Sequence, residues 1–538
     1  MGPEGGGQAA VWSESVYSGA RVMTSAGLLI LASGLLLMAF AGIPAFSRRV
    51  RGVEVSSPKY KYWALGAIAV GMMGSTVDQG SVNIALPTIA GRFQTDLPTV
   101  QWVIIGYTLT ITALLLPMGR LADLIGRKKV YLIGSLAFVV GAMASGSSSD
   151  LTMLIPSRIF QGVGAAMTQG TGMAIIISSF PPRERGQAIG LIMTTVGTGS
   201  VLGPPIGGLL VDSLGWPFVF FISVPIGLLA AGAALVVLEE SDSTSGAPGT
   251  GDRFDWLGAA LSTGALVALL MALTNGHRSG WASPPILVAI LIFFSLLSAF
   301  VWWELRSSNP MLDLRLFRRR LFSFGVAAAF FSFLGHSAVV FLIPFYLQGV
   351  LGYNPRLAGL VMMPGPACMA LMGPLSGMLS DRYGWRRFTI GSLASSATGL
   401  FLLSRLTVGS SLALVLPALM LTGAGQGAFY SPNSSSVISS VEPERYGIVA
   451  AFLHLVRNGA NITSLAMATA IVTATMGSMG FEPSLEAVRE ATGPGVGYAF
   501  TVGLRNAFLV MMGLLVIGMA VSSVNAASAK ELGAVTST

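Results

Sequence analysis

The sequence has few charged residues and almost no cysteine for its length. Only 10% of its 538 residues are charged, whereas soluble proteins carry about 25%, and its mean hydropathy is +0.73. Cys368 is the only cysteine, which excludes an intramolecular disulfide and a multi-cysteine metal site. The protein must therefore work inside or across a membrane.

The motifs of several enzyme and pump classes are also missing. No Gly-Lys pair occurs, which excludes a P-loop and so argues against an ATP-driven pump. No His-Glu-x-x-His occurs, and the nearest approach to a nucleophile elbow, at 335–339, lacks its closing glycine and lies in an apolar run. We therefore expect no enzyme activity, no cofactor and no metal.

Apolar runs, in contrast, recur along the whole chain. A helix needs about 20 apolar residues to cross about 30 Å of hydrocarbon, and the 67 glycines suit close packing of such helices in lipid. The sequence predicts an all-α polytopic membrane protein with fifteen spans, at 22–46, 63–90, 99–119, 130–148, 151–178, 187–211, 217–238, 255–275, 284–303, 321–349, 357–379, 388–404, 412–436, 446–474 and 504–526.

The basic residues predict the orientation of these spans. Most of the 31 Lys and Arg lie in alternate loops, starting with 47–62, and such loops face the cytoplasm. The protein would lie in the cell (inner) membrane. The tail at 527–538 is then cytoplasmic, and a disordered tail at 1–21 lies on the outer side of this membrane. The run at 22–46 is too long for a signal-peptide core and its basic residues follow it, so we expect an uncleaved extra helix; a start site chosen too far upstream is the alternative. The net charge of +8 is thus a topology signal, and we expect no nucleic-acid partner.

One polar loop occurs twice. The stretch at 119–129 and the stretch at 377–387 share a Gly–Asp–Gly–Arg pattern after an apolar run. Glycines there permit tight turns and close approach, and an acid beside a basic group can form a latch that opens when helices move. Repeats in two halves are typical of two-bundle transporters. The candidate latch residues are Gly119, Asp123, Gly126, Arg127, Asp381 and Arg382.

Ionisable residues inside apolar runs are a second signal, because each costs about 2.5–3.5 kcal/mol at a helix centre. Asp78 is the only carboxylate well inside a predicted span, and it could bind and release a proton. Arg158 could bias a nearby acid, and either membrane-embedded histidine could titrate near neutral pH. A purely structural role is the alternative for each of these proton-coupling candidates: Asp78, Arg158, His336, His454 and Arg457.

Polar and aromatic side chains at helical spacing are candidates for contact with a substrate. Hydrogen bonding between helices is an equally good explanation for them. The candidates are Trp102, Tyr107, Gln161, Gln426, Tyr430 and Asn433. Glycines and prolines at 203–208 could bend the helix there and help to switch the opening of a cavity, with simple close packing as the alternative; this adds Gly203, Pro204 and Gly207 to the gating candidates.

Several of these motifs occur in the order found in one family. The chain resembles the major facilitator superfamily, and within it the fourteen-helix drug:proton antiporters. The resemblance covers about residues 60–526 and rests on the stretches at 78–87, 119–129, 158–166 and 199–208. Three positions depart from the family pattern, namely Gly80, Ser81 and Ser223.

The resemblance implies a major facilitator fold. Two six-helix bundles, at 63–238 and 321–526, would flank two linker helices at 255–303, with the extra N-terminal helix outside this plan. It implies a monomeric proton-coupled antiporter that exports lipophilic, cationic drug-like compounds by alternating access, with protons, a small substrate and membrane lipid as partners. Export of a lipid, a fatty acid or a secreted metabolite is the alternative.

Overall fold

The computed structural model describes a chain that is helical nearly throughout. The predicted helix at 22–46 and the tail at 1–21 lie outside the described residues, as does the loop at 239–254. The described residues are 60–181, 185–238, 255–280, 282–307, 314–438, 440–441, 446–481 and 494–535.

Helices of the first half follow the predicted spans, except that the helix beginning at Trp102 continues to Ile125, so that residues 119–125 of the predicted polar loop are helical. The short helices α4 and α9 lead into longer ones, so each pair corresponds to one predicted span. The helices are α3 (Tyr60–Arg92), α4 (Leu97–Val100), α5 (Trp102–Ile125), α6 (Arg127–Gly146), α7 (Leu151–Ser179), α8 (Arg185–Ser213), α9 (Phe218–Phe221) and α10 (Ser223–Val237).

The remainder of the chain contains the two linker helices and the second half. A π-helical segment, η3, extends α13, and α14 leads into α15. The elements are α11 (Trp256–Ser279), α12 (Pro284–Arg306), η2 (Leu314–Arg318), α13 (Arg320–Phe345), η3 (Tyr346–Val350), α14 (Pro355–Met362), α15 (Pro364–Tyr383), α16 (Trp385–Leu403), α17 (Leu412–Ile438), α18 (Tyr446–Ser478) and α20 (Pro494–Val535).

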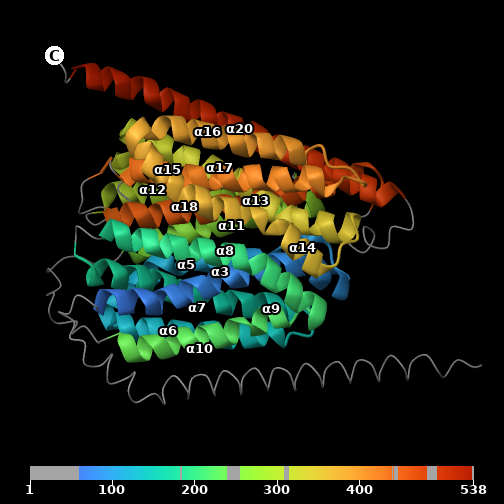
Figure 1. Ribbon diagram of the computed structural model, residues 1–538, viewed down its shortest axis with the longest axis horizontal. Helices are drawn as coiled ribbons and strands as arrows, with labels where there is room; N and C mark the ends of the chain where they lie inside the picture. The colour runs from blue at the N-terminus through green and yellow to red at the C-terminus, as the bar shows by residue number, and fades with distance from the viewer. Residues whose placement is uncertain are drawn as a thin grey trace, which may run out of the picture.

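Two groups of helices lie one above the other with their axes along the long direction of the molecule (Figure 1). In the first, α3 packs against α7, α8 and α10; in the second, α13 packs against α17, α18 and α20. The linker helix α11 contacts both groups, through α5 and α18, while α12 packs mainly on α11. This arrangement confirms the predicted fold class.

Nine helices within the described ranges are long and apolar enough to cross a membrane. The long helices α3, α7 and α8 are not among the nine, because they carry more polar residues. Two of these helices, α3 and α7, supply polar side chains of the buried cluster described below.

The repeated loop has the same backbone conformation in both halves. Gly126 ends α5 and begins α6 with a φ of +107°, and Gly384 ends α15 and begins α16 with a φ of +86°. Only glycine adopts such angles without strain. The sequence repeat therefore corresponds to a structural repeat in which each turn redirects the chain between consecutive helices.

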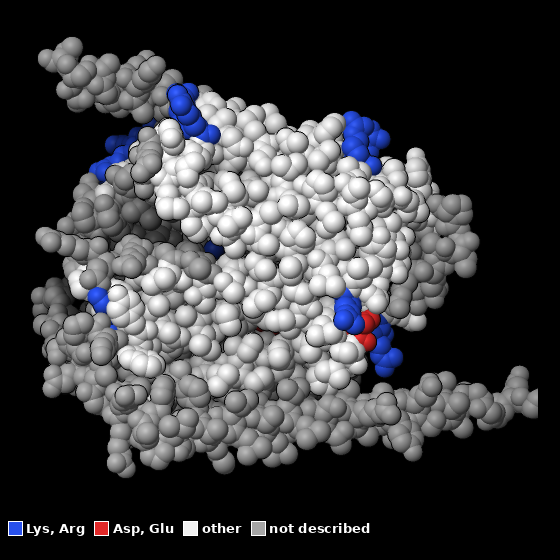
Figure 2. Space-filling view, in the orientation of Figure 1, with Lys and Arg blue, Asp and Glu red and all other residues white. Residues whose placement is uncertain are grey.

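Contacts between the two halves gather at the end of the helices away from these turns. There, Gln348 Nε2 donates to the carbonyl oxygen of Ile84 (2.8 Å), and Thr469 Oγ1 donates to Gln101 Oε1 (2.8 Å). A Cβ added to Gly208 would lie 2.3 Å from the carbonyl oxygen of Pro355, so α8 and α14 also touch. At the opposite end, where α20 finishes, Figure 2 shows a hollow with Lys or Arg atoms in its depth.

Candidate functional site

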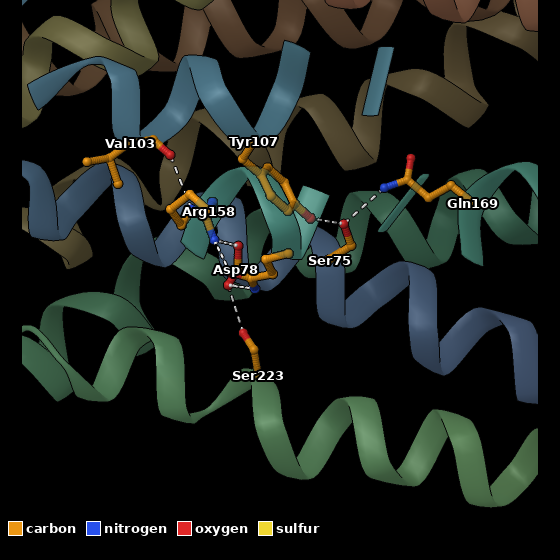
Figure 3. A network of polar contacts seen from close by, with 8 residues as sticks. Ser75, Asp78, Val103, Tyr107, Arg158, Gln169 and Ser223 are labelled. Carbon is orange, nitrogen blue, oxygen red and sulfur yellow. Dashed lines mark hydrogen bonds and ion pairs between the residues drawn. The ribbon is translucent and has the colours of Figure 1, made fainter. Parts of the chain in front are cut away.

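A buried ion pair lies in the centre of the first half (Figure 3). Arg158 Nη1, from α7, donates to Asp78 Oδ2, from α3, at 2.8 Å. Asp78 Oδ1 also accepts hydrogen bonds from Ser223 Oγ (2.8 Å) and Gln161 Nε2 (3.1 Å). Asp78 is 0% exposed and Arg158 1% exposed. Three helices, α3, α7 and α10, thus meet at one carboxylate.

Arg158 is held by further contacts that fix its direction. Its Nε donates to the carbonyl oxygen of Val103 on α5 (3.1 Å), and Nη1 also donates to Gln161 Oε1 (2.6 Å). The guanidinium carbon lies 4.2 Å from the ring centroid of Tyr107 and 5.4 Å from that of Phe220. Aromatic faces stabilise a cation in a dry site. The positive charge of Arg158 is therefore balanced by the Asp78 carboxylate and stabilised by the two aromatic rings.

A second branch of hydrogen bonds runs from the ring above Arg158. The hydroxyl of Tyr107 pairs with Ser75 Oγ (2.7 Å), which accepts from Gln169 Nε2 (3.0 Å). Ser75 stands one turn before Asp78 on α3, and Gln169 lies on α7, so both branches join the same helices. Tyr107 is fully buried in this conformation and belongs to the polar cluster.

Some members of this cluster could not be assigned a role from the sequence. In the sequence, Ser223 stands out only as a departure from the family pattern, yet in the structure its hydroxyl donates to Asp78. Ser75 and Gln169 carry a weak signal, since each is a polar residue in an apolar helix. The backbone oxygen of Val103 carries none, because any residue would supply it.

The glycine departure at position 80 has a packing explanation. A Cβ on Gly80 would lie 2.9 Å from the Cα of Gly203, and one on Gly207 would lie 2.5 Å from the Cα of Ser81. Ser81 Oγ also donates to the carbonyl oxygen of Gly203 (3.0 Å). The helices α3 and α8 therefore touch backbone to backbone beside Asp78, and α8 continues as one helix through Pro204.

The candidate latch is described only in part. Gly119 lies near α7, where an added Cβ would be 3.9 Å from the carbonyl oxygen of Gly170, and Arg127 Nη1 donates to the carbonyl oxygen of Ala174 (3.3 Å). These contacts tie the turn to α7. The side chains of Asp123, Asp381 and Arg382 lie outside what the structure describes.

The predicted polar stripe on α17 faces α13. Gln426 Oε1 accepts from Ser332 Oγ (3.0 Å), and Asn433 Nδ2 donates to the carbonyl oxygen of Gly325 (3.1 Å). The ring of Tyr430 stands edge-on to that of Phe333, with centroids 6.0 Å apart. Trp102, from the first half, is partly buried against the apolar core at the closed end.

The remaining proton-coupling candidates lie in the second half, away from Asp78. Arg457 contacts His454 Nε2 one turn away on α18, and His454 Nδ1 lies 3.3 Å from Asn458 Nδ2. His336, on α13, is half-buried, and its Nδ1 has no hydrogen-bond partner. Asp78, Arg158 and Gln161 therefore come together, whereas the histidines and Arg457 form a separate region. Among the described residues, no group of three or more metal-binding side chains occurs.

Two repeated halves of membrane-spanning helices, in contact at one end, with a buried ion pair inside the first half, define the class of this protein as a polytopic membrane transporter. A sequence profile described as Major Facilitator Superfamily matches residues 67–465. The chain is 35% identical to the riboflavin transporter RibZ of Clostridioides difficile over 74% of this chain and 86% of that protein. It is 33% identical to the multidrug resistance protein Stp of Mycobacterium tuberculosis (strain CDC 1551 / Oshkosh), over 78% and 77% respectively.

A solved structure has the same fold. It is that of a bacterial homologue of the human lysosomal transporter Spinster, with a TM-score of 0.64 and 19% identity, over 87% of this chain and 98% of that one. The chain belongs to the major facilitator superfamily, and its relatives place it in the drug-efflux family.

Proposed function

We propose that this protein is a proton-coupled antiporter that exports lipophilic, drug-like small molecules by alternating access. The observation that carries the proposal is the ion pair of Asp78 and Arg158, which is buried among the helices of the first half. A carboxylate can take up and release a proton, whereas arginine keeps its charge under all physiological conditions. Within the ion pair, only Asp78 can therefore gain and lose a proton.

Protonation of Asp78 would change the balance of forces among α3, α7 and α10. A neutral carboxyl no longer offsets the charge of Arg158, which must find other acceptors or reach water. The remaining acceptors of Arg158 are Gln161 Oε1 and the carbonyl oxygen of Val103. Proton uptake thus favours a different packing of these helices, and this difference in stability between two conformations is what coupling requires.

The direction of export follows from which end of the molecule has the open hollow. The hollow lies at the end of the molecule where α20 finishes, and the distribution of basic residues predicts that this end faces the cytoplasm, in the inner membrane of the cell, with the N-terminus outside. The opposite end is closed by contacts such as that between Gln348 and Ile84. We assign this conformation to loading from the cytoplasm, in a protein that works as a monomer surrounded by lipid.

A second candidate is export of a secreted metabolite or a vitamin. The relative RibZ is named as a riboflavin transporter and covers most of this chain, so an aromatic metabolite is as suitable a substrate as a drug. Both candidates share the proton-coupled mechanism and differ in the molecule that is carried.

Proton release in everted membrane vesicles tests the mechanism. Addition of a transported compound to energised vesicles should release protons from the lumen when the wild type is present. Asp78→Asn should abolish this release, because amide replaces the only titratable group of the pair, while the variant still inserts in the membrane. Thr195→Ala on α8 is the matched control and should keep coupling, because the Thr195 hydroxyl donates to the carbonyl oxygen of Leu191 within its own helix (3.0 Å). Full proton release by Asp78→Asn would contradict the proposal.

A further inference from the structure

The helices that enclose the polar region of the second half contain no acid. Neither α13, α17 nor α18 carries an Asp or Glu anywhere in its length. Arg457 lies in the interior of α18, and its described contact is with His454. In the first half, by comparison, the buried Arg158 is matched by Asp78. Within α13, α17 and α18, no acidic side chain therefore offsets the charge of Arg457.

Two buried polar atoms in the same region have no partner. Gln426 Oε1 accepts from Ser332, but the amide nitrogen of Gln426 makes no hydrogen bond; His336 Nδ1 makes none either. His336 stands one turn beyond Ser332 on α13, so it lies on the face that meets α17. An unsatisfied buried polar group costs about 1–3 kcal/mol, which a bound molecule with matching atoms would recover.

Arg457 belongs to the same neighbourhood. Asn461, one turn along α18, accepts a hydrogen bond from Ser337 Oγ of α13. Ser337 directly follows His336 in the chain. Aromatic side chains of Phe333 and Tyr430 stand edge-to-face between α13 and α17. An arginine, an amide nitrogen, an imidazole nitrogen and an aromatic pair are thus supplied by three adjoining helices.

We propose that α13, α17 and α18 form a binding site for neutral or anionic aromatic compounds that carry carbonyl or carboxylate oxygens. This rests on the proposed export function and assigns the substrate class. Arg457 and Gln426 offer hydrogen-bond donors, which acceptor oxygens satisfy, and the aromatic pair offers a flat surface for a ring system. A cation would meet Arg457 without a counter-charge in a medium of low dielectric, where like charges repel strongly. The proposed site therefore favours neutral or anionic compounds over the cationic compounds that the family resemblance implies.

Two dyes with the same xanthene ring and opposite charge test this assignment. Purified full-length protein in detergent is titrated with fluorescein, an anion near pH 7.5, and with rhodamine 123, a cation, and binding is followed by fluorescence anisotropy. We expect fluorescein to bind at least about tenfold more tightly. Arg457→Gln should weaken fluorescein binding by about tenfold and leave rhodamine 123 binding unchanged or tighter. Arg405→Gln, at an exposed arginine that stacks on Phe401, is the control and should change neither.

A second variant tests the same site in case Arg457→Gln does not fold. Gln426→Leu keeps the volume of the side chain and removes its free amide nitrogen, so it should weaken fluorescein binding several-fold and spare rhodamine 123. If rhodamine 123 binds as tightly as fluorescein, or if neither variant shifts the ratio of the two affinities, the assignment is overturned. Binding needs no proton gradient, so loss of proton release in vesicles with intact dye preference refutes the antiport mechanism alone.

Discussion

Replacing Asp78 with Asn removes the charge that balances Arg158 inside the first half. The two side chains are 2.8 Å apart and are both almost completely inaccessible to solvent. Two unit charges about 4 Å apart interact by about 4 kcal/mol at an effective dielectric constant of 20, and leaving one member of a buried pair uncompensated costs about 3–5 kcal/mol. We expect Asp78→Asn to lower the free energy of unfolding by about that amount.

The reverse replacement should cost less. In Arg158→Gln, Asp78 is left without a cation, but a carboxylate can take up a proton and become neutral, whereas arginine cannot lose its own. The double variant Asp78→Asn/Arg158→Gln contains no charge at this position, so most of the stability should return. The expected order of stability is wild type, then the double variant, then Arg158→Gln, with Asp78→Asn lowest.

Unfolding in mixed micelles by a denaturing detergent measures these differences in stability, with proton release in vesicles measured on the same preparations. The double variant is the critical sample, because it should recover stability without recovering coupling. If the double variant is as unstable as Asp78→Asn, the pair does not interact in the manner described. If it couples protons to export, Asp78 is not the titrating group.

Three further predictions concern packing, turns and the closed end. Gly164→Ala would place a Cβ 2.3 Å from the backbone nitrogen of Phe138, so α6 and α7 must separate, and we expect a loss of about 1–3 kcal/mol in unfolding free energy. Gly126→Ala forces a side chain into a φ of +107° and should cost about 1–2 kcal/mol in the same assay; no change in either variant would contradict the packing described. Gln348→Ala removes the hydrogen bond to the carbonyl oxygen of Ile84, worth about 1 kcal/mol, and so should raise the outward-open population about fivefold, as seen in spin-label distances across that end.

Much of the helical framework follows from local properties of the chain. Apolar runs must form helices in lipid because every backbone polar group has to be satisfied internally. For this reason most helix bounds lie within a few residues of the predicted spans, but α20 (Pro494–Val535) begins ten residues before the predicted span at 504–526 and ends nine residues after it. The α5–α6 and α15–α16 turns were also predictable, since glycine at positions 126 and 384 permits the positive φ that each turn adopts. The latch proposed for Asp123 and Asp381 remains a prediction.

The members of the Asp78–Arg158 cluster differ in how readily the sequence reveals them, because some are far apart in the chain. Asp78 and Arg158 are conspicuous as charges in apolar helices, and Gln161 stands one turn from Arg158. That all three meet Ser223, from a helix that begins some 60 residues later, depends on how α3, α7 and α10 pack. No periodicity within one helix contains this information, because the contacts are made between helices.

By itself, the sequence determined that this chain lies in a membrane, approximately where the described helices lie, and that a polar motif repeats in its two halves. These properties depend on hydropathy, on the position of glycine and on the sign of charges in loops, all of which act locally. The tertiary structure alone decided that Arg158 pairs with Asp78, while the contact of Arg457 within the described part of the chain is with His454. The physical reason is that the energy of a buried charge depends on its nearest neighbours in space, and those neighbours come from helices distant in the chain.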